Sequence, residues 1–99
     1  MAENEVLNVA KEYANAVRKV IDAKAIFLYG SHAKGTATEN SDIDIAVVVD
    51  RVHGDYLTLV SKLWGLTREV SHEIEPVLLA EADSQSGFLQ TVERTGIAV

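Results

Sequence analysis

The sequence predicts a single α/β domain, spanning residues 1–99, in which helices pack on one small β-sheet. That length suits one domain with one ordinary hydrophobic core. A hydrophobic fraction of 47% and a charged fraction of 24% are typical of a globular protein that folds in water. Amphipathic stretches alternate with short apolar runs, and this alternation indicates helices layered on a sheet.

The first half of the chain contains one predicted helix and two predicted strands. Residues 3–22 should form a helix, because apolar side chains recur there at spacings of three and four. Residues 25–29 are a short apolar run ended by a Gly-Ser pair, and we expect a strand there. A second strand is predicted over residues 42–49, after a polar break. The expected apolar stripe of the helix comprises Val6, Val9, Ala10, Tyr13, Val17, Val20 and Ile21.

The second half repeats this alternation. A polar turn over residues 50–55 leads into a predicted helix over residues 55–71 and a third strand over residues 73–79. A short helix over residues 86–94, with Gly96 as its C-terminal stop, and a last strand over residues 97–99 complete the expected order.

Charge and composition exclude several classes of protein. Fifteen acidic residues against nine basic ones give a net charge of −6, which argues against direct binding of nucleic acid. There are no cysteines, so disulfides and thiolate metal sites are excluded. The acidic N-terminus is not a signal peptide, and the longest aliphatic run, residues 45–49, is far too short to span a bilayer. We therefore expect a cytoplasmic protein without a membrane partner.

Two aspartates, Asp42 and Asp44, open an otherwise apolar strand. Side chains two apart in a strand lie on the same face, so the two carboxylates should lie side by side. Two close anions repel unless a cation neutralises both, and paired carboxylate oxygens suit Mg²⁺. The alternative is that one aspartate ends the strand and the other is solvated.

Gly30 and Ser31 lie where the first strand ends and a helical turn begins. Glycine allows the backbone to approach a ligand closely, and Ser31 as an N-cap would leave backbone N–H groups directed at an anion. The pair could thus cradle a phosphate, or it could form an ordinary strand-to-helix turn. The segment is not a P-loop, because Lys34 precedes Gly35 and no Gly-Lys-Ser/Thr follows.

Taken together, these features resemble the signature of nucleotidyltransferases of the DNA polymerase β superfamily. Ten residues separate the Gly-Ser pair from Asp42-Ile43-Asp44, as that signature requires. The matching positions are Gly30, Ser31, Ala33, Gly35 and Ser41 to Ile45, and the closing segment with Phe88, Leu89, Glu93, Arg94, Gly96 and Ile97 is similar to that of the small minimal nucleotidyltransferases. The resemblance covers essentially the whole chain. It implies the nucleotidyltransferase fold, a small mixed sheet with helices packed on it.

The resemblance also implies a third catalytic carboxylate on a neighbouring strand. Glu75 is the best candidate, and Glu73, with the same side-chain parity, is the alternative. Proline cannot donate to a sheet ladder, so Pro76 predicts that this strand lies at an edge or is irregular. In the implied site, Gly30 and Ser31 bind the nucleotide phosphates, and Asp42, Asp44 and Glu75 hold two Mg²⁺ ions.

The function that the resemblance implies is Mg²⁺-dependent transfer of AMP, or another NMP, from ATP or another NTP to a hydroxyl group. Minimal nucleotidyltransferases are commonly paired with a separate HEPN-domain toxin, and act as antitoxins by modifying a tyrosine of that partner. The alternative is a non-catalytic antitoxin that holds nucleotide or masks its partner sterically. The sequence also leaves room for a homo-oligomer.

Overall fold

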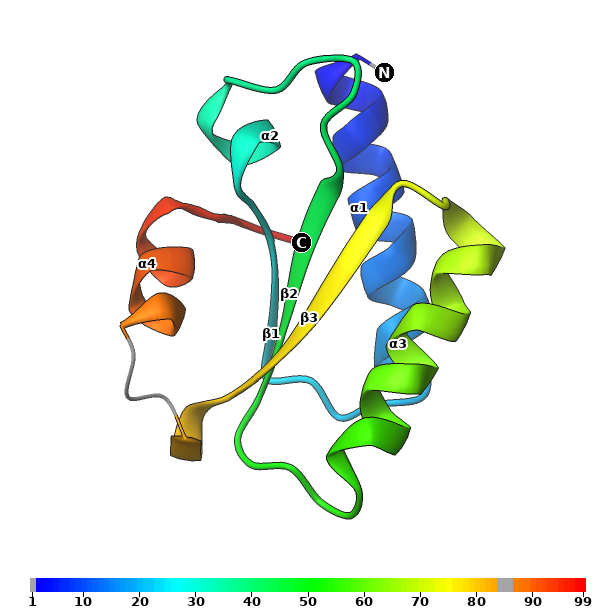
Figure 1. The fold of residues 1–99 in the computed structure, drawn as a ribbon, viewed down its shortest axis with the longest axis vertical. Coiled ribbons are helices and arrows are strands. Elements are labelled where there is room, and N and C mark those ends of the chain that lie inside the picture. The colour runs from blue at the N-terminus through cyan, green and yellow to red at the C-terminus, as the bar shows by residue number, and fades with distance from the viewer. Residues whose placement is uncertain (1, 84–86) are drawn as a thin grey trace.

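Residues 2–83 and 87–99 of the computed structural model describe a four-stranded sheet with helices on both faces (Figure 1). The elements in chain order are α1 (Glu3–Arg18), β1 (Ala25–Tyr29), α2 (Ser31–Lys34), β2 (Ile43–Val49), α3 (Tyr56–Val70), β3 (Ile74–Ala80), the 3-10 turn η1 (Glu81–Asp83), α4 (Phe88–Thr95) and β4 (Ile97–Ala98). The predicted fold class and the predicted order of helices and strands are confirmed. Ser86, where the last helix was expected to begin, lies outside the described residues.

The strands lie in the order β3-β2-β1-β4, and the sheet is mixed. β1 pairs antiparallel with both β2 and β4, whereas β2 and β3 are parallel and are connected through α3. β3 is therefore an edge strand, as Pro76 predicts. An edge position suits Pro76, because this residue has no backbone N–H to give to a second neighbour.

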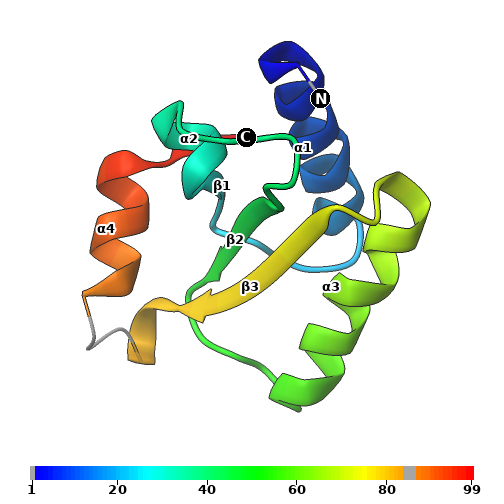
Figure 2. The same cartoon turned by 45° about the horizontal axis from the view of Figure 1, so that its top comes forward.

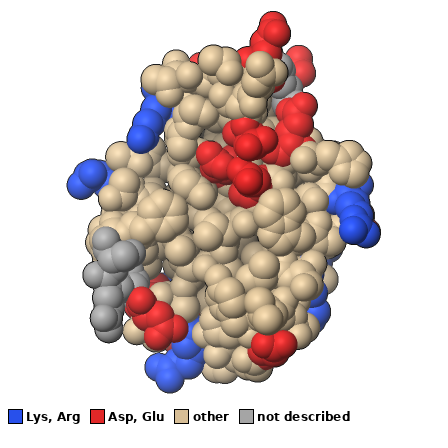
Figure 3. Space-filling view, in the orientation of Figure 1, with Lys and Arg blue, Asp and Glu red and all other residues tan. Residues whose placement is uncertain are grey.

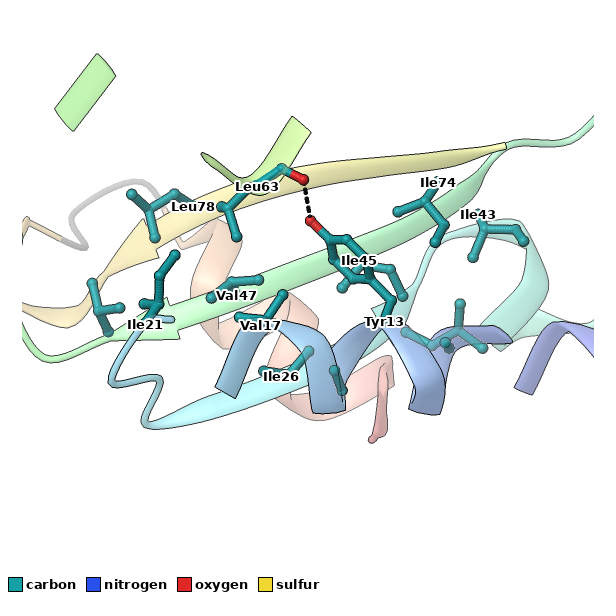
Figure 4. Packing of buried hydrophobic residues seen from close by; sticks show 14 of the residues in the cluster. Tyr13, Val17, Ile21, Ile26, Ile43, Ile45, Val47, Leu63, Ile74 and Leu78 are labelled. Carbon is teal, nitrogen blue, oxygen red and sulfur yellow. Dashed lines mark hydrogen bonds between the residues drawn. The ribbon is translucent and has the colours of Figure 1, made fainter. Parts of the chain in front are cut away.

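The main core lies between the sheet and the helices α1 and α3 (Figure 4). Tyr13 of α1 is fully buried there, and its hydroxyl donates a hydrogen bond of 2.6 Å to the carbonyl oxygen of Leu63 in α3. The strands contribute alternate residues to this core, with Ile43, Ile45 and Val47 of β2 on one face. This hydrogen bond thus joins the two helices within a largely apolar layer.

The opposite face of the sheet is covered in part by α4 (Figure 2). Leu89 and Val92 of α4 are buried, as are Ala46 and Val48 of β2, whose side chains alternate away from the main core. The start of β2 on this face has no such cover from α4, and it carries the aspartates discussed below.

The predicted end of the first helix differs from the observed one. α1 ends at Arg18 rather than at residue 22, and the chain turns with the amides of Val20 and Ile21 both bonded to the carbonyl of Val17. This turn keeps Ile21 buried but leaves Val20 51% exposed, so Val20 does not belong to the core stripe.

In the described part of the chain, no helix has the length and apolar character needed to cross a membrane.

Gly96 ends α4, as predicted, but not for the expected reason. Its φ of −82° is open to any residue, so a left-handed cap does not explain it. A Cβ at this position would lie 2.6 Å from the Val92 carbonyl oxygen and 3.1 Å from the Leu28 carbonyl oxygen. Gly96 is required because the chain passes closely over β1 on its way into β4.

Candidate active site

Three carboxylates meet on one face of the sheet, where β2 and β3 begin. Asp44 is paired in parallel register with Glu75, so the two side chains leave neighbouring strands on the same face. Asp42 precedes β2 by one residue and shares the parity of Asp44. Figure 3 shows acidic side chains gathered on this face over the region where β2 and β3 lie, while the Lys and Arg side chains in view lie at its margins.

The electrostatics show that these carboxylates are close enough to influence one another. A hydrogen bond with Asp42, and then the negative charge of Asp42, raises the pKa of Glu75, with smaller contributions from burial and from Asp44. Burial, followed by the charge of Asp42, raises the pKa of Asp44, and His32 opposes part of that rise. Each ionised group thus makes ionisation of its neighbour less favourable, as expected for like charges that share a site.

Gly30 brings the backbone against this cluster. Its φ of +76° is a conformation that side-chain-bearing residues rarely adopt, and an added Cβ would lie 2.5 Å from Oδ2 of Asp44. The chain then enters α2, whose third and fourth amides donate to the Gly30 carbonyl. The glycine is therefore needed for both its conformation and its contact with Asp44.

The expectation that Ser31 is the N-cap of this turn was wrong. Gly30 occupies the N-cap position, and Ser31 is the first residue inside α2. β1 ends at Tyr29, as predicted, and the helical turn begins one residue earlier than expected, because Gly30 can take the positive φ that starts it. Ser31 follows Gly30, the residue that lies against Asp44, and stands at the start of the turn, where the first amides of a helix lack partners within the helix.

The loop between α2 and β2 is held by short-range hydrogen bonds. The Thr38 amide donates to Oγ of Ser41 at 2.9 Å, and the Ser41 amide donates to the Thr38 carbonyl at 3.1 Å. Nε2 of His32 lies 3.4 Å from the Ser41 carbonyl oxygen. These contacts fix the approach of the chain to Asp42 and place His32 next to the cluster.

The donor chemistry of the cluster fits Mg²⁺. Carboxylate oxygens are hard ligands, and nearby negative charge contributes to the raised pKa of Asp44 and of Glu75, a repulsion that a bound cation would offset. Among the residues that the structure describes, no group of three or more Asp, Glu or His side chains is arranged so that it could hold a metal ion. Mg²⁺ commonly binds through only one or two carboxylates and completes its shell with water and substrate phosphates.

The register distinguishes the two candidates for the third carboxylate. Glu75 lies inside β3 opposite Asp44, whereas Glu73 precedes the strand and its amide donates to Oγ of Ser71. The carbonyl oxygen of Glu73 accepts from the amide of Ile43, so its backbone forms the first rung of the parallel pair. The structure brings Glu75, rather than Glu73, into contact with Asp42.

Residues 5–99 match the family described as Polymerase beta, Nucleotidyltransferase. The chain belongs to this family. Two candidate protein adenylyltransferases of Methanocaldococcus jannaschii are similar in sequence: MJ1379 is 33% identical over 64 residues, and MJ0604 is 46% identical over 56 residues. These alignments cover 61% and 54% of this nucleotidyltransferase-family chain and 64% and 55% of the two relatives, so the chain spans less than two thirds of their length.

Two solved structures share the fold of this Polymerase beta family member. A candidate nucleotidyltransferase from Sulfolobus solfataricus superposes with a TM-score of 0.69, at 18% identity, over 97% of this chain and 80% of the other. A toxin–antitoxin solved with AMP-PNP superposes with a TM-score of 0.53, at 24% identity, over 99% of this chain and 72% of the other. At these identities the likeness concerns the nucleotidyltransferase fold.

Sequence reasoning missed Tyr29, an aromatic residue next to the acidic cluster of this family member. Tyr29 is paired with Asp44 across β1 and β2, and its ring meets that of Phe88 edge to face, with 5.6 Å between centroids. Burial, then the charges of Asp44 and Glu75, raises the pKa of Tyr29. The position of Tyr29 directly before Gly30 was the available signal, but only the strand register shows which face it occupies.

Proposed function

We propose that this chain is a Mg²⁺-dependent nucleotidyltransferase that transfers AMP from ATP to a hydroxyl group of a partner protein. The observation that carries the proposal is the convergence of Asp42, Asp44 and Glu75 on one face of the sheet, next to the tight turn at Gly30. Three carboxylates at this spacing repel one another, so they serve poorly as a purely structural feature.

The residues of the site would have two roles, phosphate binding and metal binding. Gly30, Ser31 and the backbone at the start of α2 would bind the β- and γ-phosphates, and the three carboxylates would hold two Mg²⁺ ions against the phosphates. The ions supply charge neutralisation for the departing pyrophosphate and lower the pKa of the acceptor hydroxyl. The acceptor oxygen forms a bond to the α-phosphorus, the bond from the α-phosphorus to the pyrophosphate oxygen breaks, and the hydroxyl proton passes to a carboxylate or to water. Positioning and electrostatics provide most of such catalysis, so few further residues are needed.

The acceptor in this proposal is a tyrosine of a separate HEPN-domain toxin, and the chain is its antitoxin. The net charge of −6 disfavours an RNA acceptor, which leaves a protein as the better partner. Two curated relatives are named as candidate protein adenylyltransferases, and one structure of the same fold is a toxin–antitoxin with AMP-PNP, which supports this choice. Exposed apolar side chains on α3, including Leu57 at 70% and Trp64 at 44% exposure, are available for a protein contact.

The test is transfer of label from ATP to the protein encoded next to this chain's gene. With α-labelled ATP and Mg²⁺, the partner should become labelled on tyrosine, and γ-labelled ATP should give no label. Asp44→Asn and excess EDTA should each abolish labelling, while Glu73→Gln provides a matched carboxylate substitution that keeps it. Transfer of the γ-label, or labelling that persists in Asp44→Asn, would contradict the proposal.

The alternative, a binding module without catalysis, makes a different prediction in the same experiment. If the chain only masks its partner, Asp44→Asn should still form the complex and suppress toxicity as well as the wild type does. Loss of suppression by Asp44→Asn, with the complex intact, supports transfer.

A further inference from the structure

A strip of apolar side chains leads away from the acidic cluster along the same face of the sheet. Val77 and Leu79 follow Glu75 at two-residue steps in β3, so all three side chains leave the strand on one face. Both are partly exposed, unlike their neighbours Pro76 and Leu78, which are buried toward the main core. We call Tyr29, Val77, Leu79 and Phe88 the apolar strip.

Two aromatic rings form one side of the strip. Tyr29, opposite Asp44, contacts Phe88 at an interplanar angle of 80°, and Phe88 remains 39% exposed. The contact therefore links the first residue of α4 to the strand that borders the acidic cluster. An aromatic side chain that keeps this much exposed area can provide a surface on which a flat ring packs.

The strip continues into a pocket of about 230 Å³ at the far end of β3. Leu79 and Phe88 belong to both, and Tyr56 and Asp83 stand among the other residues that line the pocket. This volume is small for a complete ligand but suits one ring system at its mouth. An ionised Asp83 can only accept hydrogen bonds, which favours a ring that carries an amino group.

We infer that the apolar strip binds the nucleoside part of the nucleotide, with the sugar over Val77 and the base packed against Phe88 at the mouth of the pocket. This inference rests on the proposed function, because the acidic cluster must hold the phosphates first. Strand geometry places Val77 roughly 7 Å and Leu79 roughly 13 Å from Glu75 along β3. Those steps match the order in which the sugar and the base follow the α-phosphate.

The spacing also favours a nucleoside over an aromatic side chain of the acceptor. An acceptor tyrosine must bring its hydroxyl to the acidic cluster, so its ring cannot also reach Leu79. A base is separated from the α-phosphate by a sugar and therefore reaches the pocket while the phosphates remain at the cluster. Asp83 additionally predicts that ATP binds more tightly than UTP.

The test compares binding of Mg²⁺-ATP and Mg²⁺-tripolyphosphate by calorimetry. In the wild type, ATP should bind more tightly than tripolyphosphate. Phe88→Ala should weaken ATP binding tenfold or more and leave tripolyphosphate binding unchanged. Trp64→Ala is the matched control, since it removes another half-exposed aromatic ring, on the helix that packs against the opposite face, and it should change neither affinity.

Phe88→Leu is included because it keeps an apolar side chain at the start of α4 while removing the aromatic face. It should show most of the loss in ATP affinity with an unchanged melting temperature. Equal affinity of the wild type for ATP and tripolyphosphate would overturn the inference and leave the phosphate site intact. Failure of both ligands to bind would overturn the proposed function together with it. Unchanged ATP binding in Phe88→Ala with loss of transfer would assign the strip to the acceptor and overturn the inference.

Discussion

Asp44 is central to both the geometry and the electrostatics of the site. It is paired with Tyr29 on one side and Glu75 on the other, and one of its oxygens would collide with a Cβ on Gly30. Burial and Asp42 raise its pKa, so the ionised form of Asp44 lowers the stability of the folded chain. This loss of stability is absent in acid, where the carboxyl of Asp44 is protonated. It grows as the pH rises above the ordinary pKa of an aspartate.

Asp44→Asn should therefore keep the fold and abolish transfer. The substitution removes one of the crowded anions, so the melting temperature without metal at pH 7 should hold or rise relative to the wild type. Thermal unfolding in EDTA at pH 4 and pH 7 measures this, and the gain should be larger at pH 7. A clear drop in melting temperature would show that Asp44 has a structural role.

Glu75→Gln should reduce transfer at least tenfold, whereas Glu73→Gln should not. Glu75 contacts Asp42 and lies opposite Asp44, while Glu73 precedes the strand. A tenfold loss corresponds to roughly 1.4 kcal/mol in the barrier. Single-turnover transfer at saturating Mg²⁺ compares the two variants. Should Glu73→Gln be the inactive one, the third ligand is two residues earlier than the register indicates.

At the scale of elements, the contacts that hold the site in place lie far from the chemistry. The hydroxyl of Tyr13 joins α1 to α3, and α3 in turn connects the two strands that carry the carboxylates. On the other face, Gly96 allows the end of α4 to pass over β1. Each contact gives a stability prediction of its own.

Tyr13→Phe should cost roughly 1 kcal/mol, the usual value of a lost buried hydrogen bond. It should also change the pH dependence, because burial raises the pKa of Tyr13 above its ordinary value. The neutral phenol is favoured in the fold, so stability is fully present below pH 10 and declines as the pH rises above it. Urea unfolding at pH 8 and pH 11 should show a smaller decline for Tyr13→Phe, and an equal decline would mean that Tyr13 is not ionised on unfolding.

Gly96→Ala should destabilise the chain by about 1–3 kcal/mol, the usual range for overpacking. The new Cβ would lie 2.6 Å and 3.1 Å from two backbone carbonyl oxygens, those of Val92 and Leu28. Gly65→Ala is the control: it lies in α3 with no atom within 4 Å of the new Cβ, and should stabilise by about 0.5–1 kcal/mol. Chemical denaturation of both variants tests the contrast. A neutral Gly96→Ala would show that the end of α4 can shift.

At the scale of the whole molecule, the sequence identified the elements and the pair Asp42 and Asp44 because both depend on local spacing. It also gave an edge position as one of two possibilities for β3, since a missing N–H at Pro76 is a local property with a consequence for the sheet. It preferred Glu75 to Glu73 only through the family resemblance, and it did not find Tyr29, because both positions depend on the register between strands far apart in sequence. The sequence also did not predict that α1 ends early, because Val20 fits the helical spacing although its side chain lies outside the core.

The whole-molecule prediction concerns metal and nucleotide together. The acidic face repels a bare triphosphate, so ATP should bind only with Mg²⁺ and should bind weakly to the isolated chain. Calorimetry with Mg²⁺ and with excess EDTA measures the difference. Equal ATP affinity under both conditions would contradict a metal bridge between the carboxylates and the phosphates.

The edge position of β3 has a consequence for how activity is lost. In the described sheet this strand is hydrogen-bonded only to β2, and at Pro76 its open edge has no N–H with which to pair another strand. Fraying of the outer strand would carry Glu75 away from the two aspartates while the rest of the molecule stays folded. Mild denaturant should therefore abolish transfer at a lower concentration than the one that unfolds the chain, and a ligand that bridges β2 and β3 should oppose this loss of order.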